Sequence, residues 1–148
     1  MSERTGQCLC GAVSFTASDV PSRAGICHCE QCRRWTGSAL IGVTVPRAGL
    51  TWQGAEHIAE HVSSDWAKRG FCARCGSTLF FQFTGGDPKW AEGTEIPVGL
   101  FDDPDGFEIK SEIFIDHKPD SYAFAGEGRT VLTRAEVIEK APQVGGAS

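Results

Sequence analysis

The seven cysteines of this chain fall into short groups, and thiolates grouped in this way bind metal ions or act as nucleophiles. The groups are Cys8 and Cys10, then Cys27, Cys29 and Cys32, and finally Cys72 and Cys75. Because seven is odd, at least one cysteine cannot take part in an internal disulfide. Disulfides are also rare in reducing compartments, where clustered cysteines more often hold metal. We therefore expect metal ligation and not a disulfide scaffold.

The spacing of the groups indicates which cysteines share an ion. A zinc ribbon built from two C-x-x-C pairs would combine Cys29 and Cys32 with Cys72 and Cys75. Residues 33–71 separate those pairs, well beyond the roughly 15–20 residues usual in such ribbons. That pairing would also leave the other three cysteines without partners. A better partition places the triplet Cys27, Cys29 and Cys32 on one ion and the complete set Cys8, Cys10, Cys72 and Cys75 on another.

The two sets predict different roles for their ions. A closed four-cysteine zinc site is structural, whereas three protein ligands with an open position are typical of a catalytic zinc. Two alternatives stay open for the triplet. A fourth protein ligand, such as His28 or a distant histidine, would make it structural, and the C-x-x-C of Cys29 and Cys32 would suit redox chemistry. Gly11 and Gly76 directly follow two of the groups and permit the positive φ of a tight ligand-bearing turn.

Three segments carry a specific combined motif. They are Gly6-x-Cys8-x-Cys10-Gly11, then Cys27-His28-Cys29-x-x-Cys32-Arg33-Arg34-x-Thr36-Gly37-Ser38, and Gly70-Phe71-Cys72-x-x-Cys75-Gly76-Ser77. Together they resemble the glutathione-dependent formaldehyde-activating enzyme family, which also includes centromere protein V, and the likeness runs over about residues 6–122. It implies a mainly β fold of small antiparallel sheets, the β-tent zinc fold shared with methionine-R-sulfoxide reductases. Tyr122 stands where many members carry tryptophan.

The resemblance also implies two zinc ions and an activity. It implies a structural zinc on the four-cysteine set and a second, catalytic zinc on Cys27, Cys29 and Cys32, where the substrate thiol would bind. The implied activity is that of a carbon–sulfur lyase acting on a thiol–aldehyde adduct, as in an S-(hydroxymethyl)glutathione synthase, which uses glutathione and formaldehyde. The alternative is a non-enzymatic zinc-binding scaffold or binding module with two structural zincs.

The ligand type at the triplet favours binding of a thiol over activation of water. Three thiolates leave a divalent ion with a net negative charge, so it is a weaker Lewis acid than zinc held by histidines. It still accepts a soft fourth ligand and holds a coordinated thiol as thiolate. Arg33, Arg34 and Lys68 are candidate partners for the carboxylates of a glutathione-like substrate, and Trp35 is a candidate cover for the site. Solvated surface charges and a core aromatic are equally open readings of these residues.

The elements that must position these residues are mostly expected to be strands. Short alternating or apolar runs, separated by glycine and proline, predict strands over residues 12–17, 39–45, 78–83, 96–101 and 112–115. Residues 57–66 fit a strand better than a helix, so His57 and His61 are expected at the surface and not on a metal. Thr133 and Glu136 match a capping box that begins a short C-terminal helix, for which Pro142 sets the limit. We expect one zinc-binding domain over residues 1–148.

Composition narrows the class of partner. The formal net charge is −5 and no basic stripe is present, which argues against nucleic acid. No apolar run approaches the roughly 20 residues that cross a bilayer, which argues against a membrane partner. Residues 1–7 are polar and contain no signal-peptide core, so the default expectation is a cytoplasmic protein. The expected partners are a small thiol and an aldehyde, and His117, in a polar loop, is expected to be solvated.

Overall fold

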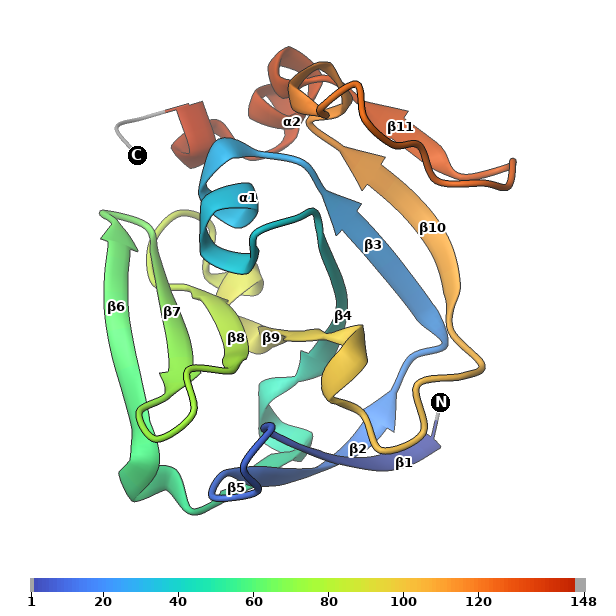
Figure 1. Ribbon diagram of the computed structural model, residues 1–148. Helices are drawn as coiled ribbons and strands as arrows, with labels where there is room; N and C mark the ends of the chain where they lie inside the picture. Colours follow the sequence, from blue (N-terminus) through green and yellow to red (C-terminus); the bar gives the residue numbers. More distant parts are fainter. Residues whose placement is uncertain (1, 146–148) are drawn as a thin grey trace.

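The computed structural model describes residues 2–145 and places them in two β-sheets with two short α-helices (Figure 1). The smaller sheet is antiparallel, with strand order β1-β2-β5. Its strands are β1 (Ser2–Gln7), β2 (Ser14–Val20) and β5 (Leu50–Gln53). Phe15 of β2 lies opposite both Gly6 and Trp52, and a Cβ at Gly6 would lie only 2.4 Å from the Phe15 ring. The absence of a side chain at Gly6 therefore makes room for this buried ring.

The larger sheet has the strand order β11-β10-β3-β4-β9-β8-β7-β6. Its members are β3 (Arg23–Cys27), β4 (Leu40–Pro46), β6 (Ile58–Ser64), β7 (Ala67–Cys72), β8 (Thr78–Phe83), β9 (Gly93–Pro97), β10 (Glu108–Ile113) and β11 (Thr130–Leu132). β10 runs parallel to both β3 and β11, whereas the other neighbouring pairs are antiparallel. The chain thus returns late to extend the sheet beside β3, the strand that ends in Cys27.

The hydrophobic core lies between the smaller sheet and one face of the larger sheet. Val43 and Val45 of β4 alternate toward this core and are fully buried with Phe15. The Phe15 ring makes edge contacts with Trp52 and Phe101, each at 5.4 Å between centroids. Alternation along β3 and β4 turns Cys27 and Gly42 to the opposite face, so the core and the cysteine triplet lie on different faces of the sheet.

Both α-helices lie at the end of the larger sheet where β3 ends (Figure 1). Helix α1 (Glu30–Thr36) begins at Cys29, whose sulfur caps it by accepting the Cys32 N–H, and it ends at the left-handed Gly37. Helix α2 (Arg134–Lys140) begins at Thr133 with the complete capping box that the sequence predicts. Short 3₁₀ turns link the strands at Arg47–Gly49, Ala55–His57, Pro88–Glu92, Val98–Leu100, Ile115–His117 and Pro142–Gly145.

The mainly β class with a short C-terminal helix is confirmed, and residues 58–64 form a strand as expected. Two predicted strands end early. The one over 96–101 ends at Pro97 because a 3₁₀ turn follows, and the one over 112–115 ends at Ile113 because Phe114 has a positive φ of 56°. The parallel pairing of β10 also departs from a purely antiparallel arrangement. From residue 2 to residue 145, no helix combines the length and apolar character needed to span a bilayer.

Candidate metal centres

The four-cysteine set joins two turns that are far apart in the sequence. Cys8 and Cys10 lie between β1 and β2, while Cys72 ends β7 and Cys75 lies in the turn to β8. The four sulfur atoms lie within 4.8 Å of one another, with 3.6 Å between Cys8 and Cys10 and 3.8 Å between Cys10 and Cys72. Sulfurs at about 2.3 Å from a tetrahedral zinc are about 3.8 Å apart, so this donor set fits a closed zinc site.

Glycine shapes both of these turns. Gly11 and Gly76 each have φ of 79°, and their N–H groups donate to the carbonyl oxygens of Cys8 (3.1 Å) and Cys72 (2.8 Å). A Cβ at Gly76 would meet no atom within 4 Å, so the left-handed backbone and not lack of space requires glycine there. The Val13 N–H donates to the Cys8 sulfur at 3.4 Å, a contact that favours the thiolate a metal needs.

Ser77 connects the two turns through its hydroxyl. The Ser77 oxygen accepts the Leu9 N–H at 3.0 Å and lies 3.2 Å from the Cys75 sulfur. Hydrogen bonds from the hydroxyl and the N–H of Ser77 lower the pKa of Cys75 to about 5. Ser77 therefore supports a thiolate in one turn while it holds the backbone of the other.

The cysteine triplet forms at the junction of β3 and α1. Cys27 is the last residue of β3, Cys29 is the N-cap of α1 and Cys32 lies in its first turn, with all three sulfurs within 4.8 Å of one another. Hydrogen bonds from Cys27 and Cys32 lower the pKa of Cys29 to about 2, and the Cys32 N–H donates to its sulfur at 3.3 Å. Within residues 2–145, no histidine, aspartate or glutamate joins this sulfur cluster as a fourth ligand.

Arg69 of β7 places a buried positive charge beside the triplet. The residue is 3 % exposed, and its Nη1 donates to the Cys32 sulfur at 3.7 Å. Its guanidinium carbon lies 4.9 Å from the ring centroid of Trp35 and 5.0 Å from that of Phe81. A buried cation is costly unless it is paired, and three thiolates around a divalent ion supply the opposite charge. Arg69 is thus suited to offset the charge of a loaded triplet.

Lys68, the neighbour of Arg69, is the candidate substrate contact that the sequence predicts on this segment. Lys68 points to the other face of β7, where its Nζ pairs with Glu60 Oε2 at 2.8 Å. It lines neither of the two hollows beside the triplet that are described below. Adjacent side chains of a strand point to opposite faces, so a strand over residues 67–72 places Lys68 and Arg69 on different faces. That strand was not predicted from the sequence, and Arg69 was therefore not recognised as the residue beside the triplet.

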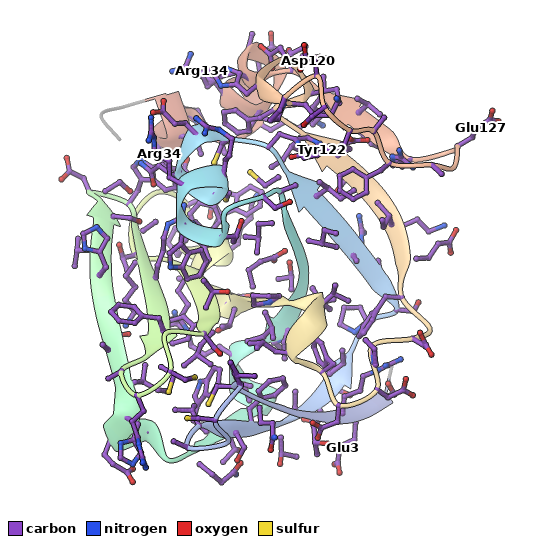
Figure 2. The ribbon with its side chains drawn as sticks, in the orientation of Figure 1. Glu3, Arg34, Asp120, Tyr122, Glu127 and Arg134 are labelled. Carbon is purple, nitrogen blue, oxygen red and sulfur yellow. The ribbon has the colours of Figure 1, made fainter. Side chains whose placement is uncertain are left out.

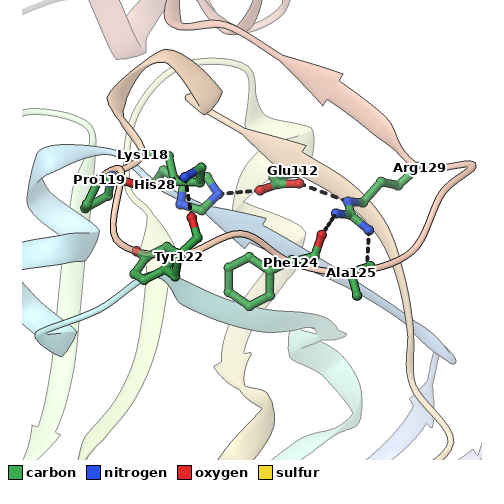
Figure 3. Close-up of polar contacts among 8 residues, drawn as sticks. All are labelled: His28, Glu112, Lys118, Pro119, Tyr122, Phe124, Ala125 and Arg129. Atoms are coloured by element: carbon green, nitrogen blue, oxygen red, sulfur yellow. Dashed lines mark hydrogen bonds and ion pairs between the residues drawn. The ribbon is translucent and has the colours of Figure 1, made fainter.

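His28 anchors the segment between two of the triplet cysteines (Figure 3). It is 1 % exposed, and its Nε2 lies 2.7 Å from Glu112 Oε1 on β10. Arg129 Nε donates to Glu112 Oε2 at 2.9 Å, and its Nη groups donate to the carbonyl oxygens of Phe124 and Ala125. Burial alone would raise the pKa of Glu112, but the hydrogen bonds from His28 and Arg129 lower it. His28 therefore ties the triplet to β10 and stands outside the sulfur cluster.

Tyr122 and Phe124 form an aromatic cover over His28. Their ring centroids lie 6.2 Å and 5.9 Å from that of His28, and the two rings meet edge to face at 5.8 Å. The Lys118 ammonium group donates to the carbonyl oxygens of Pro119 (2.7 Å) and Tyr122, which fixes this loop. Tyr122 thus packs against the buried histidine.

Two hollows meet at the triplet. An outer groove of about 540 Å³ is lined by Cys29, by aromatic side chains such as Trp35 and Trp66, and by ionisable side chains, namely Glu30, Arg34, His61, Arg69, His117 and Arg134. An inner cavity of about 640 Å³ is lined by all three cysteines and mostly by apolar and aromatic side chains. Figure 2 shows Arg34 and Arg134 at the same end of the molecule, near α1 and α2. The triplet therefore adjoins a groove that carries several charged side chains and a cavity that is mostly apolar.

Some of the residues predicted as substrate contacts line these hollows and others do not. Arg34 lines the outer groove, where its Nε pairs with Glu30 Oε1 at 2.9 Å, and Trp35 lines the same groove against Arg69. Arg33 is half-buried on α1 and lines neither hollow. His61 and His117 are exposed as expected, yet both line the groove. Arg134 lines it as well, and no sequence pattern indicated this residue. Only the fold brings these distant residues to one groove.

Comparisons with known proteins agree with this architecture. Residues 3–117 match the family described as glutathione-dependent formaldehyde-activating enzyme. An uncharacterized lyase of Schizosaccharomyces pombe is 32 % identical over 139 residues, which cover 94 % of this chain and 97 % of that protein. The crystal structure of a Rhodobacter sphaeroides protein has a TM-score of 0.55 at 22 % identity, covering 87 % of this chain and 99 % of that one. At this identity, the similarity to the Rhodobacter sphaeroides protein concerns the fold alone.

Proposed function

Because this chain belongs to the glutathione-dependent formaldehyde-activating enzyme family, we propose that it is a zinc-dependent carbon–sulfur lyase acting on the adduct of a glutathione-like thiol and an aldehyde. The observation that carries the proposal is the triplet of Cys27, Cys29 and Cys32, which offers three sulfur donors at the junction of two hollows. Three protein ligands with an open fourth position are typical of catalytic zinc. The four-cysteine set is the proposed structural zinc site.

The chemistry follows from the donor set. A zinc ion on three thiolates would hold a substrate thiol as its thiolate and is poorly suited to make hydroxide. Arg69 then offsets the negative charge of the cluster through its contact with Cys32. His28 keeps Cys27 and Cys29 in place through its link to Glu112. In the addition direction, substrate sulfur bonds to the carbonyl carbon and the carbonyl oxygen takes up a proton, and lysis reverses both events.

The outer groove is the proposed binding place of the thiol substrate. Glutathione carries two carboxylates and one ammonium group, so it needs cations and an anion at short range. Arg34 and Arg134 supply the cations and Glu30 supplies the anion, all in the groove that also exposes Cys29. Guanidinium groups bind carboxylates through paired hydrogen bonds, which gives orientation as well as charge.

The proposal is tested by exchange NMR of glutathione mixed with formaldehyde, and separately with phenylacetaldehyde. We expect the zinc-loaded protein to speed the interconversion of free thiol and adduct above the rate in buffer for at least one aldehyde. Cys29→Ser should return the rate to that in buffer, whereas Lys68→Met, which changes a side chain outside both hollows, should keep it. Exchange at the buffer rate with both aldehydes would contradict the proposed activity.

A further inference from the structure

The inner cavity is larger than the family's reference aldehyde requires. Its volume is about 640 Å³. Formaldehyde has two heavy atoms and needs little more room than a water molecule, whose share of liquid volume is about 30 Å³. An apolar cavity of about 150 Å³ already holds a benzene molecule. The space beside the triplet thus falls within the range of about 300–1,000 Å³ that pockets for larger organic ligands occupy.

Two glycines on the sheet allow side chains of the neighbouring strands to form the floor of this cavity. Gly25 of β3 and Gly42 of β4 are paired across the two strands, and both line the cavity on the face that carries Cys27. A Cβ at Gly25 would lie 2.7 Å from Ser111 Oγ, and one at Gly42 would lie 2.4 Å from Glu95 Oε1. Glycine at these two positions therefore makes room for the Ser111 and Glu95 side chains, which line the floor of the cavity.

The walls of the cavity are apolar and aromatic. They are formed by side chains of β8, the 3₁₀ turn at Pro88–Glu92, β10, β11 and α2, including Phe81, Phe83, Trp90, Ile113, Leu132 and Val137. Rings of this kind bind an apolar or aromatic group through area burial and edge contacts. The outer groove shares part of this lining, including Cys29 and Trp66, but adds charged side chains such as Glu30, Arg34 and Arg134. The two hollows therefore suit the two chemically different halves of one adduct.

Glu95 is the acidic side chain inside the cavity. Its Oε2 accepts the Thr44 hydroxyl at 2.6 Å, and burial raises its pKa. Arg23 and Lys140 also line the cavity, but both are exposed residues and so belong to its rim. The buried Arg69 lines the cavity at its triplet end, where it contacts the Cys32 sulfur.

Resting on the proposed function, we propose that the carbonyl partner is an aldehyde with an apolar substituent about the size of a phenyl ring, which binds in the inner cavity while the thiol carrier occupies the outer groove. The triplet lies between the two, where the carbon–sulfur bond forms or breaks. Formaldehyde would leave the inner cavity almost empty and would gain nothing from its aromatic walls. The size and lining of the cavity thus set the substrate class.

The test compares two stable thioethers, S-benzylglutathione and S-methylglutathione, by isothermal titration of the zinc-loaded protein. We expect the benzyl compound to bind at least about tenfold more tightly, since each buried methylene in an apolar pocket is worth roughly tenfold or more. Val137→Phe adds a ring to the cavity wall and should remove this preference while S-methylglutathione binds as before. Val131→Phe is the matched control, because Val131 is exposed and lies outside the cavity lining.

The outcomes separate this inference from the proposed function. Equal affinity of the wild-type protein for the two thioethers, or a preference that survives Val137→Phe, would overturn the substrate class. Acceleration of exchange with formaldehyde alone would leave the lyase proposal standing and overturn the inference. A benzyl preference that Val137→Phe removes, in a protein that accelerates neither exchange, would establish the apolar subsite and reject the lyase reaction.

Discussion

Arg69 and Lys68 are adjacent cations on β7 with different surroundings. Arg69 is buried between two aromatic rings and contacts the Cys32 sulfur, whereas Lys68 pairs with Glu60 at the surface. A buried guanidinium next to thiolates acts on the metal through its charge, while a surface ion pair contributes little. The two residues therefore form a natural pair of test positions.

We expect Arg69→Met to weaken metal binding at the triplet by roughly 10–100-fold, the usual effect of removing a partner of metal ligands. Methionine keeps much of the apolar contact with Trp35 and Phe81 while it removes the charge. Competition with a chromophoric chelator measures this affinity. Lys68→Met should leave it within about twofold of wild type, since a surface pair contributes little. Equal losses in the two variants would show that Arg69 has no special relation to the cluster.

Glu112 should contribute a distinct part of the acid sensitivity of the fold. Hydrogen bonds from His28 and Arg129 outweigh burial and lower its pKa below the ordinary 4.5. A carboxyl group with a lowered pKa stabilises the fold above its unfolded-state pKa, and this contribution is lost as pH falls through the folded-state value. Glu112→Gln should therefore have a lower melting temperature than wild type at pH 7. Its melting temperature should also fall less than that of wild type on acidification below about pH 4.5.

Glu30→Gln provides the control for this pH series. The pKa of Glu30 is also lowered, by the hydrogen bond from Arg34, but that pair is solvent-exposed. Solvent screens such a pair, so its removal should leave the fall of the melting temperature at acidic pH nearly unchanged. If Glu30→Gln weakened the pH dependence of the melting temperature as much as Glu112→Gln does, the importance of the buried link between His28, Glu112 and Arg129 would be contradicted.

Spacing along the chain predicts some site residues and misses others. The partition of seven cysteines into two sets follows from local distances, and the structure brings the members of each set together. The link between His28 and Glu112 joins residues 84 positions apart, so no local pattern indicates it. Arg69 was not predicted as a site residue because its burial depends on which face of a strand it occupies.

At the scale of elements, the two cysteine sets connect very different lengths of chain. The four-cysteine set holds the β1–β2 turn against the β7–β8 turn, whereas the triplet lies within the end of β3 and the first turn of α1. Closing a long loop costs more chain entropy than closing a short one, and a metal that does so offsets that cost. The first set should therefore govern folding.

We expect Cys75→Ser to unfold or aggregate the protein and Cys29→Ser to leave it folded. Structural zinc contributes roughly 10–16 kcal/mol of apparent binding energy, which is comparable with the whole stability of a domain, about 5–15 kcal/mol. Thermal melts followed by circular dichroism measure the difference. Equal damage from both substitutions would mean that the division into a structural and a catalytic centre is wrong.

Elements with strong local signals were predicted, and those defined by tertiary contacts were not. Helix α2 follows from the Thr133–Glu136 capping box. Helix α1 has only seven residues and a cysteine as its N-cap, so it carries no ordinary start signal. Strand β1 is polar, with Gly6 its one buried residue, and becomes a strand by pairing with β2. Pairing partners, and not local pattern, decide such segments.

At the scale of the whole molecule, sulfur atoms gather in two separate regions, one beside the smaller sheet and one beside α1 (Figure 2). The hydrophobic core lies around the first region, and the two hollows adjoin the second. The fold thus places one cysteine set where it can stabilise and the other where small molecules can reach it. An exchangeable fourth position at the triplet is the claim on which this account depends.

Cobalt substitution at the triplet tests that claim most directly. Cobalt is loaded at the triplet in place of the proposed zinc, and glutathione is titrated while the visible and near-ultraviolet spectrum is recorded. We expect a new sulfur-to-cobalt charge-transfer band that saturates with glutathione and is absent in Cys29→Ser, because the soft ion accepts a thiolate as its fourth ligand. A spectrum that stays unchanged at millimolar glutathione would show a closed site and favour a scaffold with two structural zincs.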